Sequence, residues 1–74
     1  MSQATAERHA NLVKMANQIS EFFESESGAQ APANIAEHLK KFWDPRMRRA
    51  IVAYTREGGG GLRDAAAKAV ALLA

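Results

Sequence analysis

Hydrophobic residues recur at intervals of three and four along most of the chain, which is the spacing of an amphipathic α-helix. The first such stretch covers residues 5 to 24. Its apolar positions are Leu12, Met15, Ala16, Ile19, Phe22 and Phe23. Residues 25 to 28, Ser-Glu-Ser-Gly, are typical of a helix end, because glycine readily adopts a left-handed backbone. We therefore predict a first helix with one buried face.

A second helix is predicted to begin near Pro32, whose fixed φ angle suits the first turn of a helix. Its apolar side chains have the same spacing and are Ile35, Ala36, Leu39, Phe42 and Trp43. The helix should end before Asp44, because the residue that precedes a proline is disfavoured in helical geometry.

Asp44 and Pro45 then predict the start of a third helix. The Asp44 side chain can accept a hydrogen bond from the backbone N–H near Met47, and Pro45 suits the first helical position. The buried face of this helix should consist of Met47, Ala50, Ile51 and Tyr54. We therefore predict a tight corner between two helices with almost no loop.

Four consecutive glycines, residues 58 to 61, should end the third helix and form a mobile joint. A glycine-rich phosphate loop is the alternative, but neither a Gly-Lys-Ser/Thr ending nor G-x-G-x-x-G after a strand is present. A last, alanine-rich helix is predicted over residues 62 to 74. Its apolar positions are Leu62, Ala66, Ala69, Val70 and Leu73. With so few large side chains, it should either pack closely against a neighbour or become ordered with a partner.

The 74 residues suffice for one domain, so we predict a single all-α bundle of three to four helices over residues 1–74, with a polar tail at residues 1–4. Hydrophobic residues make up 47% and charged residues 24%, which is typical of a folded globular protein. The chain has no cysteine, so neither a disulfide nor a thiolate-bound metal can add stability. A chain this short should gain stability from a partner surface.

The net charge of +2 is too small to predict nucleic-acid binding by itself. The N-terminal residues are polar and lack the apolar run of a signal peptide. The alanine- and leucine-rich run at residues 65–74 is too short to span a bilayer and contains Lys68. We therefore expect a cytoplasmic protein without a membrane partner.

Candidate catalytic residues have no suitable companions. His9 and His38 are far apart and lack a metal-binding spacing such as H-x-x-x-H, and no serine lies in a G-x-S-x-G motif. Glu21, Glu24 and Glu26 form an acidic cluster, for which solvation is favoured over pairing with a basic surface. We expect no catalytic, cofactor-binding or metal-binding residues in this chain.

The stretch KKFWDPRMRRAI, residues 40 to 51, has the highest density of cationic and aromatic residues. Helical geometry distributes its arginines around the outside of the third helix, whereas a nucleic-acid site would align them on one face. Trp, Arg and Met are enriched at the centres of protein interfaces. We therefore predict partner binding by Phe42, Trp43, Arg46, Met47 and Arg48, with Asp44 and Pro45 shaping the corner.

Two alternatives remain open for this stretch. Trp43, Phe42 and Met47 could equally belong to the core, because their spacing does not separate core from interface positions. For the arginines, the alternative is a solvated face. For the whole chain, the alternative function is that of a small, basic, helical nucleic-acid-binding protein.

Three segments resemble a known family: NLVKMANQISEFF at residues 11–23, IAEHLKKFWDPRMRRAI at residues 35–51, and GGGGL at residues 58–62. They are similar to the small delta subunit of cytoplasmic NAD-dependent formate dehydrogenases that contain molybdenum or tungsten. The resemblance covers roughly residues 9–73, and the F-W-D-P-R-M-R core is its most specific part.

The resemblance implies a non-catalytic accessory subunit that docks on the formate dehydrogenase assembly and supports its stability or the maturation of its molybdenum cofactor. The implied partners are the catalytic and diaphorase subunits. These partners are expected to carry bis-molybdopterin guanine dinucleotide, iron–sulfur clusters, FMN and NAD, and none of these cofactors is expected in this chain. Self-association and permanent residence in the finished enzyme are left open.

Overall fold

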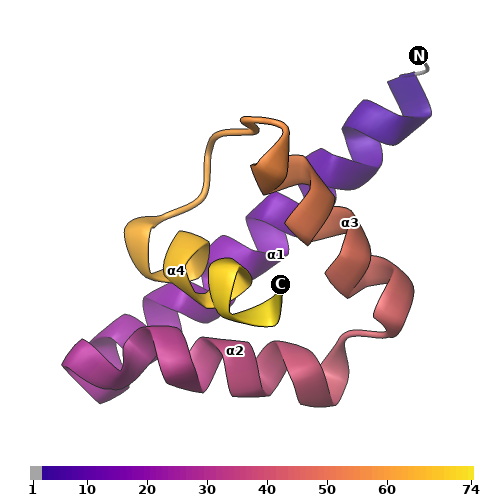
Figure 1. The fold of residues 1–74 in the computed structure, drawn as a ribbon. Helices are drawn as coiled ribbons and strands as arrows, with labels where there is room; N and C mark the ends of the chain where they lie inside the picture. Colours follow the sequence, from indigo (N-terminus) through magenta and orange to yellow (C-terminus); the bar gives the residue numbers. More distant parts are fainter. Residues whose placement is uncertain (1–2) are drawn as a thin grey trace.

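The computed structural model describes the backbone of residues 3–74 and the side chains of residues 9–74. Within this part, the chain forms four α-helices and one 3₁₀ turn (Figure 1). They are α1 (Gln3–Ser27), η1 (Gly28–Gln30), α2 (Ala31–Phe42), α3 (Pro45–Arg56) and α4 (Asp64–Leu73). The predicted all-α bundle is confirmed. Residues 1 and 2 of the expected polar tail lie outside the described residues, and its other two residues belong to α1.

The first helix is longer than predicted, because it begins at Gln3 and continues to Ser27. Gly28 then has a φ of 54°, in the left-handed region that glycine tolerates. The amide of Asn34 donates a 2.8 Å hydrogen bond to Oγ of Ser27, across the turn between α1 and α2. Helix α1 therefore ends immediately before the glycine of the predicted stop signal.

Helix α4 lies near the middle of the molecule, in front of α1, above α2 and beside α3 in Figure 1. Ala66 and Ala69 are fully buried, and Val70 is almost so. Small side chains let two helix backbones approach closely, which allows α4 to pack mainly against α2. The close packing that was one of the two expectations for this helix is therefore present. The helix is shorter than predicted, since residues 62 and 63 precede it.

The buried face of α1 differs from the predicted one. The buried line is formed by Leu12, Ala16 and Ser20, which recur at intervals of four. Met15 and Phe22, both expected in the core, are 39% and 60% exposed. At 100° per residue these two side chains lie at the far edge of the apolar stripe, beyond the surface that the other helices cover. The apolar face of α1 is therefore wider than the part of it that the other helices cover.

The glycine run is bound to neighbouring helices at both of its ends. The backbone N–H of Gly59 donates to the carbonyl of Tyr54 at 2.9 Å, and the Tyr54 hydroxyl donates to the carbonyl of Gly60 at 2.6 Å. At the other end, the Asn17 amide donates to the carbonyl of Gly61 at 2.8 Å. The segment expected to be a mobile joint therefore follows a path defined by contacts with α3 and α1.

Replacing Gly59 by alanine is expected to destabilise the fold. A Cβ at this position would lie 2.5 Å from Cζ of Tyr54, a ring that is also held by the Gly60 carbonyl and packed against His9. Relieving this overlap should cost about 1 to 3 kcal/mol of unfolding free energy, measured by urea denaturation. The matched control is Gly60→Ala, which meets nothing within 4 Å and should change stability by about 0.5 kcal/mol or less. Equal effects of the two substitutions would contradict the proposed contact.

Candidate functional site

The corner between α2 and α3 is formed by two residues with extended backbones. Trp43 has φ −90° and ψ 136°, and Asp44 has φ −72° and ψ 166°. Oδ1 of Asp44 accepts a 3.0 Å hydrogen bond from the backbone N–H of Met47, so the expected N-cap interaction is present. Pro45 occupies the first turn of α3, where its missing N–H has no cost. The corner is thus set by its local sequence.

Arg48 closes this corner from the side of α3. Its Nη1 atom donates to the carbonyl of Lys40 at 3.0 Å and to the carbonyl of Trp43 at 2.6 Å. Carbonyls at the end of a helix have no partner within the helix, and a cation there is also favoured by the helix dipole. Arg48, which the sequence predicted to bind a partner, therefore has an internal structural role.

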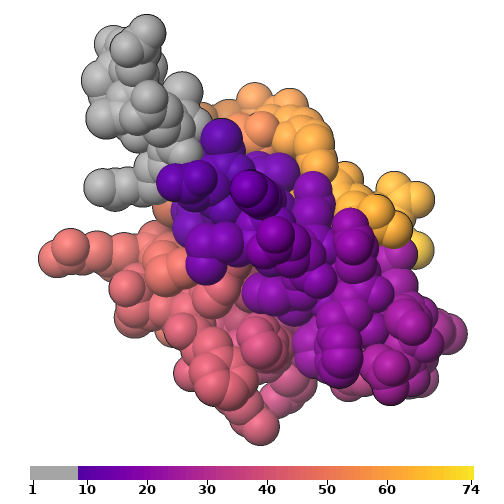
Figure 2. Space-filling model, turned by 180° about the vertical axis from the view of Figure 1, so that it is seen from behind, coloured from indigo at the N-terminus to yellow at the C-terminus, as the bar shows by residue number. Residues whose placement is uncertain are grey.

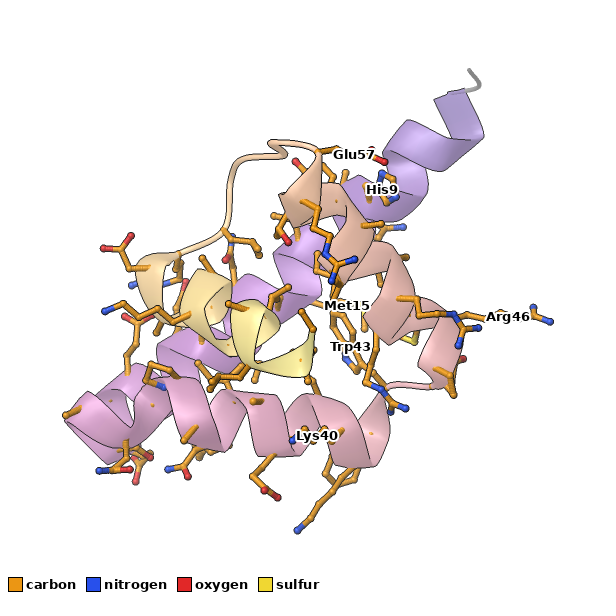
Figure 3. All side chains as sticks on the ribbon, viewed as in Figure 1. His9, Met15, Lys40, Trp43, Arg46 and Glu57 are labelled. Carbon is orange, nitrogen blue, oxygen red and sulfur yellow. The ribbon has the colours of Figure 1, made fainter. Side chains whose placement is uncertain are left out.

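The predicted partner-binding residues are not all at the surface. Trp43 is only 5% exposed and points between the helices, whereas Arg46 is exposed and points away from the molecule (Figure 3). Phe42, next to Trp43 in sequence, is 70% exposed. Met47 is half-buried and lines a hollow of about 220 Å³ together with Arg46 and Leu12. Trp43 therefore belongs to the core in the free chain, and Phe42 does not.

Phe42 is the end of a row of aromatic rings that crosses from α1 to α2. This aromatic strip consists of Phe22, Phe23, His38 and Phe42. The ring centroids of successive members are 5.1 Å, 5.8 Å and 4.6 Å apart, which is the usual range for interacting aromatic rings. The strip joins two helices through side chains that stay largely at the surface.

Shallow grooves flank the aromatic strip on both sides. One has a volume of about 320 Å³ and is lined by Gln18 and Ile19 together with three members of the strip, Phe22, Phe23 and His38. The other has a volume of about 340 Å³ and includes Glu37 and Lys41 at its rim. From behind, α1 (indigo to purple) lies across the molecule above the pink residues of α2 (Figure 2). The strip therefore has apolar surface and room around it for another molecule.

Sequence reasoning did not find the aromatic strip. Phe22 and Phe23 were both assigned to the buried face of the first helix, and His38 was considered as a candidate catalytic or metal-binding residue. Neighbouring residues in a helix point about 100° apart, so two adjacent phenylalanines rarely face the same core. The adjacency of Phe22 and Phe23 was therefore the signal in the sequence that one of the two rings lies at the surface.

Arg63 connects the start of α4 to α1. Its Nε and Nη2 atoms donate to the two carboxylate oxygens of Glu24 at 2.9 and 3.0 Å, which is a bidentate ion pair. Asn17 accepts a 2.8 Å hydrogen bond from the backbone N–H of Arg63. A carboxylate oxygen of Glu21 lies 3.7 Å from Nη1 of the same arginine. Glu24 and Glu21 of the acidic cluster, for which solvation was favoured, therefore link α1 to the start of α4, whereas Glu26 is exposed.

The hydrogen bond from Arg63 lowers the pKa of Glu24 from 4.5 to about 2, and a second hydrogen bond from the Ser20 hydroxyl acts in the same direction. A carboxyl group with a lowered pKa stabilises the fold above its ordinary value. We expect this contribution to be complete above pH 4.5 and to disappear as the pH falls toward about 2. Glu24→Gln should therefore lower the melting temperature at neutral pH and flatten its acid dependence over that range. The control is Glu26→Gln, an exposed neighbour, whose melting curves should follow those of the unmodified chain.

Across the side chains from residue 9 onward, no group of three His, Asp or Glu residues is placed to hold a metal ion. Within residues 3–74, no helix combines the length and apolar character needed to cross a bilayer.

A family model described as NADH-dependent formate dehydrogenase delta subunit FdsD matches residues 11–70 of the chain. No match was found to a curated protein or to a solved structure. The matched range begins within α1 and ends within α4. It therefore includes the whole aromatic strip, the corner and Arg63.

Proposed function

Since this chain belongs to the FdsD family of NADH-dependent formate dehydrogenase delta subunits, we propose that it is a non-catalytic accessory subunit that docks on the catalytic assembly. Its docking supports either the stability of that assembly or the maturation of its molybdenum cofactor. In this proposal the catalytic and diaphorase subunits are the partners, in the cytoplasm. They carry bis-molybdopterin guanine dinucleotide, iron–sulfur clusters, FMN and NAD.

The observation that carries the proposal is the exposure of the aromatic strip. Phe22 and Phe42 are 60% and 70% exposed although the bundle has a closed core of its own. Clustered exposed apolar side chains commonly mark interaction surfaces, and burying a phenylalanine contributes about 1.5 to 3 kcal/mol. Two such residues on one strip supply a large part of the free energy that a small subunit needs to bind.

The corner extends this docking surface beyond Phe42. Arg46 is exposed and Met47 lines the adjacent hollow, so both can contact a partner. Trp43 and Arg48 lie beneath them and hold the corner in shape through core packing and carbonyl hydrogen bonds. We therefore assign direct contact to Phe42, Arg46 and Met47, and a positioning role to Trp43 and Arg48.

The test is to purify the tagged catalytic assembly from cells that contain this chain, lack it, or contain a variant. The variant Phe22→Ser/Phe42→Ser should remain folded, because both side chains are largely exposed. Its co-purification should fall at least about tenfold, which corresponds to a loss of about 1.4 kcal/mol of binding free energy. Molybdenum content and formate oxidation of the assembly should fall with it.

The matched control is Leu72→Ser, which removes another large apolar side chain, 56% exposed, from α4. This variant should co-purify like the unmodified chain. Unchanged co-purification, metal content and formate oxidation with the phenylalanine variant would reject the docking proposal. Unchanged metal content and formate oxidation of an assembly purified from cells that lack the chain would reject it too.

A further inference from the structure

A further groove lies between α3 and α4, away from the residues of the aromatic strip. Its volume is about 620 Å³. The floor is apolar and consists of Pro45, Val52, Ala53 and Leu73. Three arginines of α3 also line it, Arg48, Arg49 and Arg56, together with the single acidic residue Glu57. The groove therefore combines an apolar floor with an excess of positive charge.

Arg49 and Arg56 are both exposed, and neither forms an ion pair with a carboxylate among the side chains of residues 9–74. Arg48 is fixed by its two carbonyl hydrogen bonds and keeps its charge at the groove. By contrast, Arg63 already binds two carboxylates of α1. Arg49 and Arg56 are therefore available to a ligand.

The spacing of these arginines restricts the ligand. Arg49 and Arg56 are seven residues apart on one helix, which places them two turns, or about 10 Å, apart. A guanidinium group binds a carboxylate through two parallel hydrogen bonds. A helical segment with two carboxylates two turns apart has the same spacing as Arg49 and Arg56, so each carboxylate could pair with one arginine. Apolar side chains between those carboxylates would face Val52 and Leu73 on the floor.

We propose that this groove binds an acidic amphipathic helix of a partner protein, an inference that rests on the proposed docking function and adds a second contact surface to it. A second copy of this chain is a poor occupant, because Glu21 and Glu24 of its acidic cluster are already engaged by Arg63. Single-stranded nucleic acid is also a poor occupant, because such sites stack bases on aromatic rings and none lines this groove.

The direct test measures binding of synthetic peptides to the full chain by fluorescence anisotropy. The probe is a helical peptide of about 18 residues with glutamates two turns apart and leucines on the same face. A peptide of identical composition but scrambled order is its control. The ordered peptide should bind at least about tenfold more tightly than the scrambled one, and more weakly as salt rises. It should also bind more tightly than a single-stranded DNA of equal charge.

Two charge-reversed variants identify the binding surface. Arg49→Glu/Arg56→Glu should weaken binding of the ordered peptide at least about tenfold while keeping the far-ultraviolet circular dichroism spectrum. The control Lys14→Glu/Lys68→Glu changes the net charge equally at two exposed lysines outside the groove, and should alter binding by about twofold or less. Equal binding of both peptides, tighter binding of the DNA, or equal losses in both variants would overturn the proposal. A dimer of the free chain that Arg49→Glu/Arg56→Glu dissociates would overturn it too.

A photo-crosslinking residue at Ala53, on the groove floor, tests the native partner within the catalytic assembly. The segment linked to it should contain aspartate or glutamate at helical spacing beside apolar residues. If the chain co-purifies but the linked segment lacks carboxylates, the groove assignment fails while the docking proposal stands. If the unmodified chain does not co-purify, the docking proposal fails, and the peptide measurement still decides the chemistry of the groove.

Discussion

Replacing Trp43 by alanine is expected to remove a large part of the stability of the free chain, whereas replacing its neighbour Phe42 by alanine should leave the chain folded. Trp43 is 5% exposed and packs in the core, and truncating a buried aromatic side chain to alanine costs about 3 to 5 kcal/mol. A domain of this size has a total stability of roughly 4 to 11 kcal/mol. Urea denaturation followed by far-ultraviolet circular dichroism measures the loss without relying on tryptophan fluorescence.

Phe42→Ala is the matched control, because it removes an adjacent aromatic side chain that is 70% exposed. Its unfolding free energy should change by about 0.5 kcal/mol or less, while its co-purification with the catalytic assembly should fall. Trp43→Phe should recover part of the stability and, with it, the docking. If Trp43→Ala stayed as stable as Phe42→Ala but lost docking, Trp43 would be an interface residue and its assignment to the core would be wrong.

Arg48→Ala is expected to be the second most destabilising change, at about 1.5 to 3 kcal/mol. The cause is the loss of charge-assisted hydrogen bonds from Nη1 to the carbonyls of Lys40 and Trp43. Arg48→Lys should recover only part of this, because the lysine ammonium sits on a flexible stem and lacks the rigid guanidinium plane that directs Nη1 at both carbonyls. The measurement is again urea denaturation of the purified chain.

Arg46→Ala is the control for Arg48→Ala, since its exposed side chain points away from the molecule (Figure 3). It should change stability by about 0.5 kcal/mol or less. An Arg48 variant as stable as Arg46→Ala would show that the two carbonyl hydrogen bonds do not hold the corner. Charge reversal for docking assays is therefore best made at Arg46, because a substitution there should change docking without changing the stability of the fold.

Local features of the fold could be predicted because adjacent residues determine them. Asp44 and Pro45 specify the start of α3 through a cap hydrogen bond that spans three residues. Pro32 and Gly28 similarly predict the start of α2 and the end of α1. The helical periodicity predicted the all-α class, and the segments around F-W-D-P-R-M-R indicated the delta subunit family that the family model matches.

The candidate site was only partly predictable. Phe42 and Arg46 are exposed, as a docking role requires, but the sequence did not separate them from Trp43 and Arg48, whose contacts are internal. Periodicity shows which residues share one side of a helix. It does not show how much of that side the neighbouring helices cover. Phe22 was therefore placed in the core, although it lies in the aromatic strip at the surface.

The sequence by itself determined the helices, the Asp44 cap of α3, the corner and the family, because these depend on neighbouring residues or on whole motifs. Tertiary structure alone decided the pairing of Glu24 with Arg63, which are 39 positions apart, and the burial of Ser20 in place of Met15. It also decided that Arg49 and Arg56 line a groove against α4. Each of these depends on how helices are placed relative to one another, which is set by the packing of the whole core and not by any one segment.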